Sequence, residues 1–295
     1  MNLLDNLKQL FKHGNALIQL IYINVAVFAG IKAISILFLL FNSSTSFLSS
    51  YLALPADFAL LPYRIWTPLS YMFLHEAIFH ILFNMIALYW FGQIFLMYFS
   101  EKQLVGLYLF GGLIAASFYL IAYNLFPYYA GLIHQSLLLG ASGSIMAIIV
   151  AAALRAPNME LQLMLIGAVK LKFIAIASVL ISFFGITSQN GGGELAHLGG
   201  ALAGYLFVVS LQQGKDLTRG FNWILDKISS LFRPRKLRVK QNQFRKSKTM
   251  NDAEFNINKA KKMAEIDKIL DKIKTSGYES LSSEEKKRLF EQSNK

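Results

Sequence analysis

The chain has no cysteine among its 295 residues, and only 16% of its residues are charged. The lack of cysteine excludes disulfide bonds, a cysteine nucleophile and metal sites built from thiolates. Soluble globular domains carry charge on about a quarter of their residues, so the low charged fraction argues against an ordinary soluble fold. No cleavable signal peptide is expected, because Lys8 and Lys12 lead directly into an apolar run that is too long for a signal sequence.

Hydrophobic residues make up 55% of the chain, and most of them lie in long runs between residues 17 and 211. Long apolar runs with few charges are typical of helical membrane proteins with several spans. The last three predicted spans are short for about 30 Å of hydrocarbon, which suggests helices that begin or end below the membrane surface. The expected fold class is all-α, a six-transmembrane-helix bundle followed by a small helical tail. The predicted spans are 16–41, 71–98, 104–126, 139–154, 171–184 and 195–211.

Basic residues in the short loops predict the orientation of these spans. The loops that contain Lys102 and Arg155 lie on the same side as the N-terminal lysines and the basic tail, whereas the opposite loops contain only Arg64. By the positive-inside rule, both termini are then cytoplasmic, in a multi-pass protein of the cell membrane. Lys32 falls inside the first apolar run. Either its side chain snorkels to the interface, or the span ends early and 34–41 is an embedded loop.

Four segments are expected along the chain: a cytoplasmic N-terminal segment (1–15), a membrane domain (16–213), a basic juxtamembrane linker (214–259) and a cytoplasmic helical hairpin (260–295). The linker should be extended or loosely ordered as far as residue 251. Within it, 233–248 contains eight Lys and Arg residues and no acid. Its position close to the last span favours a topology determinant attracted to anionic lipid over a nucleic-acid site.

The hairpin is predicted from a change of pattern near residue 260. Gly277 should end its first helix, and Ser282-x-x-Glu285 is a capping-box sequence for a second helix through Phe290. A hairpin this small buries little area, so we expect it to dock on another surface or to be marginally stable. The apolar residues that share one face of the first helix are Ile266, Ile269, Leu270 and Ile273.

Two motifs inside apolar runs indicate chemistry: Gly-Ala-Ser-Gly at 140–143 and Ala-His-Leu-Gly-Gly at 196–200. A hydroxyl and an imidazole are costly in hydrocarbon unless they find partners or line a wet cavity. The hypothesis is that Ser142 is a nucleophile and His197 its base, with N–H groups at the start of the fourth span available to an oxyanion. The alternative is that Ser142 and its small neighbours only pack helices, and that the histidine bonds a loop carbonyl.

Two further patterns support the hypothesis. Gly200 and Gly204 follow His197 at i+3 and i+7, a small-residue face that allows two helices to approach almost backbone to backbone. His80 and Asn84 share one face of the second span, and both can donate hydrogen bonds to a developing oxyanion. The alternative for this pair is that it holds helices together by hydrogen bonds.

A zinc site is not expected, although His75-Glu76 and His80 loosely resemble a zinc-protease motif. That motif needs two histidines at i and i+4 on one helix face. Here they are five residues apart, which on a helix separates them by about 140°, and no third ligand is evident. No metal and no cofactor are therefore predicted.

Taken together, Gly-x-Ser-Gly, the later Ala-His-x-x-Gly-x-x-x-Gly and the earlier His-x-x-x-Asn resemble the motifs of the rhomboid intramembrane serine proteases. The resemblance covers about 16–211. It implies a six-helix bundle with a serine–histidine dyad and no acid, in a water-filled cavity open to the outside. By position, Ser142 would be the nucleophile and His197 the base. His80, Asn84 and the backbone N–H of Ser142 would bind the oxyanion, and substrate would enter between the second and fifth helices.

Two positions depart from that family's pattern. Tyr63 stands where a tryptophan usually precedes the arginine of the first loop, which is Arg64 here. Met146 occupies the position where many members carry an aromatic ring that stacks on the histidine. A thioether can also contact an imidazole face, so the substitution bears on how the base is tuned rather than on whether it exists.

The predicted function is an intramembrane serine endopeptidase that cleaves single-span membrane proteins near helix-destabilising residues. A pseudoprotease that binds membrane clients without cutting is an alternative, but it would be expected to lack Ser142 or His197. A transporter or channel would usually carry charges at mid-membrane or paired repeats, and apart from Lys32 none is seen. The sequence indicates neither the oligomeric state nor the natural substrates.

Overall fold

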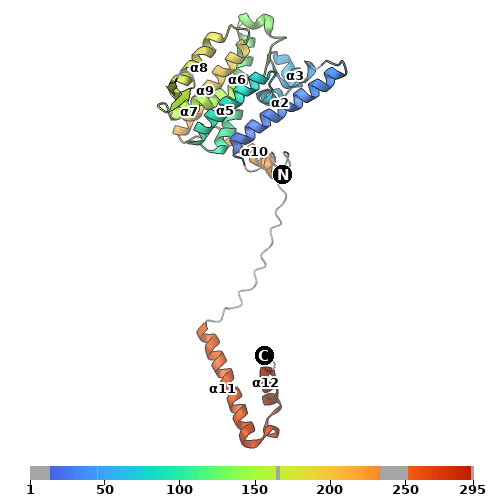
Figure 1. Cartoon of the computed structure of the whole chain (residues 1–295), viewed down its shortest axis with the longest axis vertical. Coiled ribbons are helices and arrows are strands. Elements are labelled where there is room, and N and C mark those ends of the chain that lie inside the picture. Colours follow the sequence, from blue (N-terminus) through green and yellow to red (C-terminus); the bar gives the residue numbers. More distant parts are fainter. Residues whose placement is uncertain (1–13, 45, 164–166, 233–251, 294–295) are drawn as a thin grey trace. The chain divides into compact units, whose positions relative to one another are not determined.

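The computed structural model describes residues 14–44, 46–163, 167–232 and 252–293, and most of them are helical (Figure 1). The chain divides into two compact units, 1–233 and 234–295, and each is considered by itself. The first unit contains the membrane helices and both sequence motifs. The second contains the hairpin at the C-terminus. The expected helical class is therefore confirmed, with only two small strand pairs in the described residues.

Four helices of the described residues are long and apolar enough to cross a membrane. They are α2 (Ala16–Leu40), α5 (Ile78–Leu96), α6 (Glu101–Leu125) and α9 (Gly191–Gln212). Two further apolar helices are shorter, namely α7 (Ser142–Arg155) with 14 residues and α8 (Leu171–Gly185) with 15. Every predicted span therefore contains a helix. However, the second one starts late, because Tyr71–Phe73 is a separate 3-10 turn.

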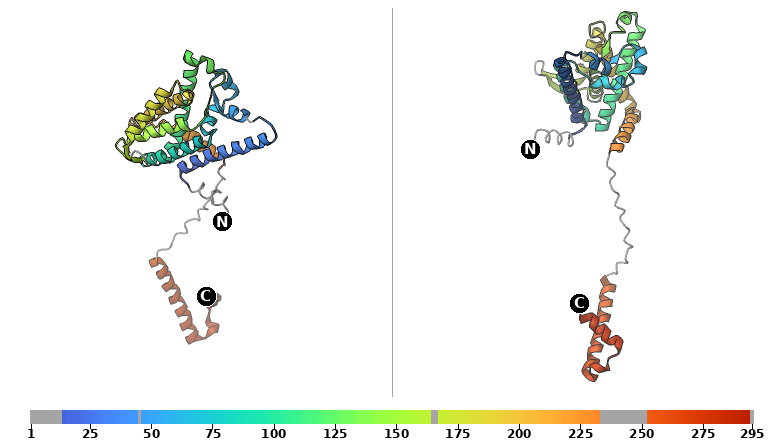
Figure 2. Two further views of the ribbon diagram at one scale, coloured as in Figure 1. Left: turned by 45° about the horizontal axis from the view of Figure 1, so that its top comes forward. Right: turned by 90° about the vertical axis from the view of Figure 1, so that its right-hand side faces the viewer.

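The buried residues of helix α2 all lie in its first half, and its C-terminal end extends away from α5 and α6 (Figure 2). These residues are Leu17, Leu20 and Asn24, and most of the side chains beyond them are exposed. The buried Asn24 amide donates to the hydroxyl of Tyr108 over 3.1 Å, and that hydroxyl donates to the Met72 carbonyl over 2.9 Å. A buried polar chain of this kind fixes the helix at one position against α6, because each polar group in it needs its partner.

The same helix settles the position of Lys32. The helix continues unbroken to Leu40, so the alternative of an embedded loop at 34–41 is wrong. Lys32 is exposed, with its ammonium group 5.7 Å from the centroid of the Phe28 ring. An exposed lysine in this position can extend along the helix toward the interface.

The centre of the first unit is a close contact of α9 with α7. A Cβ atom on Gly200 would lie 2.0 Å from the carbonyl oxygen of Gly143, and one on Gly204 would lie 2.3 Å from that of Ala147. Helix α6 completes the contact, since a Cβ on Gly111 would lie 2.6 Å from the Ala147 Cβ. The predicted small-residue face of α9 is thus confirmed as a backbone-to-backbone contact.

The segment between α2 and α5 is folded rather than a simple loop. Arg64 donates from Nη1 to the Ser50 carbonyl over 2.7 Å, and the Trp66 indole donates to the Tyr51 carbonyl over 2.8 Å. Tyr63, at the position that departs from the family pattern, is exposed. The elements here are α3 (Ser46–Leu52), β1 (Leu54–Pro55), η1 (Phe58–Tyr63), α4 (Thr67–Ser70) and η2 (Tyr71–Phe73).

The described residues contain two short strand pairs. One connects segments that are distant in the chain, and the other joins two consecutive helices. β1 pairs antiparallel with β2 (Leu137–Leu138). Along the chain, β2 follows the 3-10 turn η3 (Pro127–Leu132) and precedes α7. β3 (Glu160–Leu163) and β4 (Gly167–Lys170) form a hairpin between α7 and α8. The first pair ties the folded segment before α5 to the segment that begins α7.

The expectation of an extended chain after residue 214 is wrong for part of that segment. The structure has a helix there, α10 (Arg219–Phe232), which packs on α6. Gly106 makes room for Thr218 at this contact, and Lys102 pairs with Asp226 over 2.7 Å. The basic cluster at 233–248 and the lysines at positions 8 and 12 lie outside the described residues.

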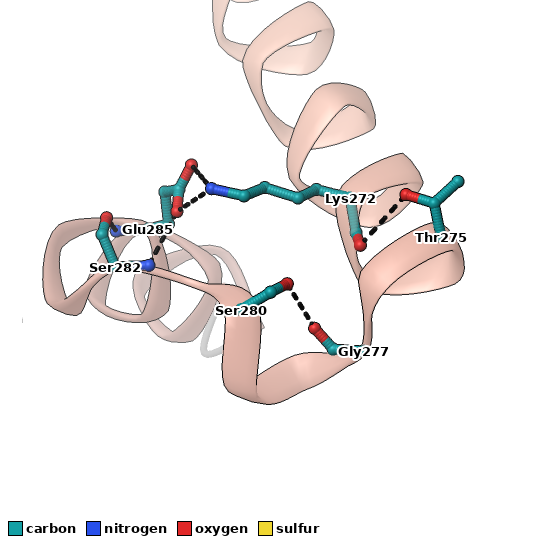
Figure 3. A network of polar contacts seen from close by, with 6 residues as sticks. All are labelled: Lys272, Thr275, Gly277, Ser280, Ser282 and Glu285. Carbon is teal, nitrogen blue, oxygen red and sulfur yellow. Dashed lines mark hydrogen bonds and ion pairs between the residues drawn. The ribbon is translucent and has the colours of Figure 1, made fainter.

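The C-terminal unit consists of α11 (Asp252–Ser276), the turn η4 (Tyr278–Ser280) and α12 (Ser283–Ser293). Gly277 ends the first helix as predicted, with φ of 77°. The capping box also forms. The Ser282 N–H donates to the Glu285 carboxylate over 2.7 Å, and the Glu285 N–H donates to the Ser282 hydroxyl over 3.3 Å. Lys272 of α11 reaches the same carboxylate at 3.0 and 3.1 Å (Figure 3).

The contact of α9 with α7 predicts that Gly200→Ala destabilises the membrane unit. The added Cβ has no room against the Gly143 carbonyl, and overpacking of this kind costs about 1–3 kcal/mol. The matched control is Gly30→Ala in α2, where a Cβ meets no atom of the described residues within 4 Å. Thermal unfolding in detergent should show a midpoint lowered by several degrees for Gly200→Ala alone. Equal midpoints for the two variants would contradict the contact.

The capping box predicts a pH dependence of the hairpin. Hydrogen bonding from Ser282 and the nearby Lys272 ammonium lower the pKa of Glu285 below its ordinary value of 4.5. The carboxylate therefore stabilises α12 above pH 4.5, and this stabilisation is lost as the pH falls through the lowered pKa. Hydrogen exchange of the full-length protein should be faster in α12 for Glu285→Gln than for wild type at pH 7, and the difference should vanish at low pH.

The control for this experiment is Glu284→Gln, the neighbouring exposed carboxylate in the first turn of α12. Comparison of variant and wild type at each pH removes the intrinsic pH dependence of exchange. If Glu284→Gln accelerates exchange as much as Glu285→Gln, the effect comes from the helix dipole and not from the capping box.

Candidate active site

Helix α7 begins at Ser142, directly after a turn in which Gly140 has a positive φ. Gly140 has φ of 118°, a backbone conformation that favours glycine, and its N–H donates to the Tyr71 carbonyl over 2.9 Å. A Cβ atom at this position would also lie only 2.9 Å from Nε2 of His80. The glycine before the serine is therefore required both by the turn and by the approach of His80.

The first N–H groups of α7 are not capped by a side chain. Ala141 has no side chain that could cap the helix, and the first helical hydrogen bond runs from the Ile145 N–H to the Ala141 carbonyl over 3.0 Å. The N–H groups of Ser142 and Gly143 consequently have no acceptor within their own helix. Such groups, together with the helix dipole, favour a negative charge near Ser142.

The structure brings all four predicted site residues together around one cavity of about 370 Å³. Helix α5 contributes His80 and Asn84, α7 contributes Ser142, and α9 contributes His197. A second cavity, of about 400 Å³, shares the His80 wall with the first and is lined mainly by polar groups. The other residues that line the first cavity are Phe79, Phe83, Leu139, Asn190 and Gly193.

Asn84 carries a hydrogen-bond donor that is not used elsewhere. The residue is only 7% exposed, and its amide nitrogen has no hydrogen-bond partner among the described residues. A buried donor without a partner costs about 1–3 kcal/mol, so such a group in a site is more useful for a ligand than for the fold. The alternative interpretation, that Asn84 holds helices together, would require a partner on a neighbouring helix.

His197 lies beside two residues that the sequence analysis did not include in the site. Its Nδ1 atom is 3.2 Å from a carboxylate oxygen of Glu194 and 3.1 Å from the hydroxyl of Ser182 on α8. The predicted span began at Leu195, whereas α9 begins at Gly191 and so includes Glu194 in its first turn. The spacing Glu-x-x-His, which places two side chains on one helix face, could have indicated this contact.

The separation predicted for His75 and His80 is wrong. Since α5 begins at Ile78, His75 lies in the loop before it, and the two rings meet edge to face with centroids 5.1 Å apart. Helical spacing therefore does not apply to this pair. Among the described residues, no group of three or more His, Cys, Asp or Glu side chains is arranged to hold a metal ion.

Met146, at the position where the sequence pattern suggested an aromatic ring, is buried in α7. It lies one turn after Ser142 on the same helix. The hydrogen-bonding partners of the His197 ring are not on α7. They are Ser182 on α8 and Glu194 on α9.

The apolar helices, and the cavity in which four polar site residues meet, define an integral membrane protein with a site inside its helix bundle. A family model described as Rhomboid domain matches residues 62–213, which is half of the chain and includes all four site residues. The chain therefore belongs to the rhomboid family. Membership makes it a protease, a hydrolase that acts on membrane proteins within the lipid bilayer.

Two further comparisons complete these findings. A second model, described as a family of unknown function (DUF6576), matches residues 249–295, which include the hairpin of α11 and α12. A comparison with curated proteins gave no match.

Proposed function

We propose that the protein is an intramembrane serine endopeptidase in which Ser142 is the nucleophile and His197 its general base. The observation that carries the proposal is the shared cavity. A serine at an uncapped helix N-terminus, a histidine and an unpartnered amide donor all line it. These are the groups that acyl transfer requires: a nucleophile, a base and donors for an oxyanion.

In the proposed reaction, the Ser142 hydroxyl attacks a substrate carbonyl while His197 takes its proton. The negative charge on the carbonyl oxygen is then stabilised by the Ser142 N–H, the Asn84 amide and His80. His197 returns the proton to the leaving amine, which gives an acyl-enzyme. Water, activated by the same histidine, hydrolyses this intermediate and restores the free serine.

The proposed substrates are single transmembrane segments that can be locally unwound. A helix engages its carbonyl groups in hydrogen bonds, so a scissile bond must leave the helix before Ser142 can reach it. Glycine, proline or small residues near the cleavage site lower the cost of this step. Phe79 and Phe83 both line the cavity and are 67% exposed, so its α5 wall offers an apolar surface to a segment arriving from lipid.

The proposed topology has six spans with both termini in the cytoplasm. The membrane domain is 16–213. It is followed by a linker that contains α10 and the basic cluster, and then by the hairpin of α11 and α12, which begins at Asp252. The short helices α7 and α8 would then cross only part of the hydrocarbon, and the start of α7 would lie below the outer surface. The basic cluster of the linker would lie at the cytoplasmic face, where anionic lipid attracts it.

The dyad predicts that Ser142→Ala and His197→Ala both abolish cleavage of a fluorogenic single-span substrate in liposomes. Loss of either member of a nucleophile–base pair removes most of the chemical rate, typically about 10⁴-fold or more. The matched controls are Ser144→Ala, two residues further along α7, and His134→Ala, an exposed histidine paired with Asp57. Both controls should cleave at close to the wild-type rate, and a chelator should have no effect.

Three results would contradict this assignment. Retained cleavage in Ser142→Ala or His197→Ala would assign the chemistry to other residues, and chelator sensitivity would favour a metal mechanism. No cleavage by wild type across a panel of helix-destabilised substrates, with binding retained, would favour a protein that holds membrane clients without cutting them.

The oxyanion role predicts that Asn84→Ala lowers kcat and leaves KM nearly unchanged. Removal of one oxyanion donor typically costs about 10²–10³ in rate, or ~3–4 kcal/mol. Thermal stability should not fall much, because the amide nitrogen has no hydrogen-bond partner in the described part of the chain. The control is Gln93→Ala, an exposed amide on the same helix. An unchanged kcat for Asn84→Ala would exclude the role.

A further inference from the structure

We propose that Glu194 is a positioning residue for His197, acting together with Ser182. It holds the imidazole in the tautomer that carries its proton on Nδ1. This inference rests on the proposed function, because it concerns how the base of that site is oriented. It adds an acid to a site for which the sequence resemblance implied a serine–histidine pair alone.

The contacts at Nδ1 determine the tautomer. The Glu194 carboxylate lies 3.2 Å from Nδ1, and an ionised carboxylate can only accept hydrogen bonds. The hydrogen must therefore be on Nδ1, from which it is donated to Glu194. Nε2 then carries the lone pair, and it is the nitrogen left to take a proton from Ser142.

Ser182 completes the arrangement from a second helix. Its hydroxyl is 3.1 Å from the same Nδ1 atom, and the residue is only 1% exposed. A hydroxyl can both accept from Nδ1–H and donate onward to the carboxylate. The ring is thus held from α8 as well as from its own helix, which fixes its orientation and not only its protonation.

The fold makes specific room for the Glu194 side chain. A Cβ atom on Gly185 of α8 would lie 2.9 Å from the Glu194 Cγ and 3.1 Å from its Cδ. The carboxylate therefore packs against the backbone of α8, three residues beyond Ser182. An acidic residue in the first turn of a helix is usually exposed to solvent and interacts favourably with the helix dipole. Glu194 instead turns inward, and its side chain is only 17% exposed.

This position gives the carboxylate a second effect on the reaction. When His197 takes the proton of Ser142, the ring becomes an imidazolium ion with a neighbouring negative charge. Both side chains are mostly removed from water, at 21% and 17% exposure, so the attraction is only partly screened. The carboxylate thus stabilises the charge that forms during attack as well as the tautomer that precedes it.

The test measures how fast Ser142 reacts with a fluorophosphonate probe in the full-length protein in detergent, because this reaction needs the base but no peptide recognition. Glu194→Gln should slow labelling by about 10- to 100-fold, and Ser182→Ala should slow it by a smaller factor. In the cleavage assay, Glu194→Gln should lower kcat by the same factor and leave KM within twofold of wild type. The matched controls should react like wild type. They are Glu160→Gln, an exposed carboxylate, and Ser178→Ala, whose hydroxyl bonds only the Ile174 carbonyl among the described residues.

A spectroscopic readout separates positioning from a merely structural role. Long-range ¹H–¹⁵N spectra of protein labelled at histidine report which ring nitrogen carries the proton. Wild-type His197 should be protonated on Nδ1 at neutral pH, and Glu194→Gln should show a mixture of tautomers. This measurement on wild type remains decisive even if the Glu194 variant fails to fold.

The outcomes distinguish the two proposals. A wild-type protein that the probe does not label at Ser142 contradicts the proposed function itself. Wild-type labelling that is unchanged in Glu194→Gln, or a wild-type His197 with its proton on Nε2, overturns the role of Glu194 and leaves the serine–histidine pair standing.

Discussion

The contact of α7 with α9 is the constraint on which the rest of the structure depends. Gly200 and Gly204 allow α9 to lie directly on the carbonyls of Gly143 and Ala147, closer than any side chain would permit. Ser142 begins one of these helices, and His197 lies one turn before the contact on the other. A helix pair held this closely at its small residues leaves little freedom for the groups beside them. The position of the two polar residues in one cavity follows from backbone packing.

Burying polar side chains in an apolar helix bundle costs free energy unless they have hydrogen-bond partners. The site residues differ in whether they have such partners. His197 has partners on two helices, whereas the Asn84 amide nitrogen has none in the described residues. Groups that must keep their geometry during a reaction gain from fixed partners, and groups that must bind a transient charge gain from having none. The contrast between these two residues therefore agrees with a base and an oxyanion donor.

Much of the site could be predicted from the sequence because its motifs follow helical spacing. Gly200 and Gly204 share a face with His197, and Asn84 lies one turn after His80. The segments between helices were less predictable. The β1–β2 pair, for example, depends on a contact between residues that are distant in the chain. Helix α10 was not predicted because the basic cluster that follows it suggested a linker for the whole segment. The helix itself has only two basic residues, and its Phe221 ring contacts Phe110 of α6.

The errors near the site have one physical cause, which is that helix ends cannot be located from hydropathy alone. Placing the start of the last span at Leu195 excluded Glu194, although the helix begins at Gly191. Placing the start of the second span at residue 71 treated His75 as helical, although it precedes the helix. Polar residues at the end of an apolar run are ambiguous, because they can belong to the loop or to the first turn of the helix. Glu194 is such a residue, and it lies beside His197.

The central claim is that Ser142 and His197 act on one substrate carbonyl in one cavity. A peptidyl chloromethyl ketone tests it directly, because the serine adds to the ketone and the histidine then displaces chloride. Mass mapping of the treated wild-type protein should find the peptide attached to His197, and the attachment should be lost or greatly slowed in Ser142→Ala. An adduct on another residue, or one that forms on His197 equally fast without the serine, would contradict the account.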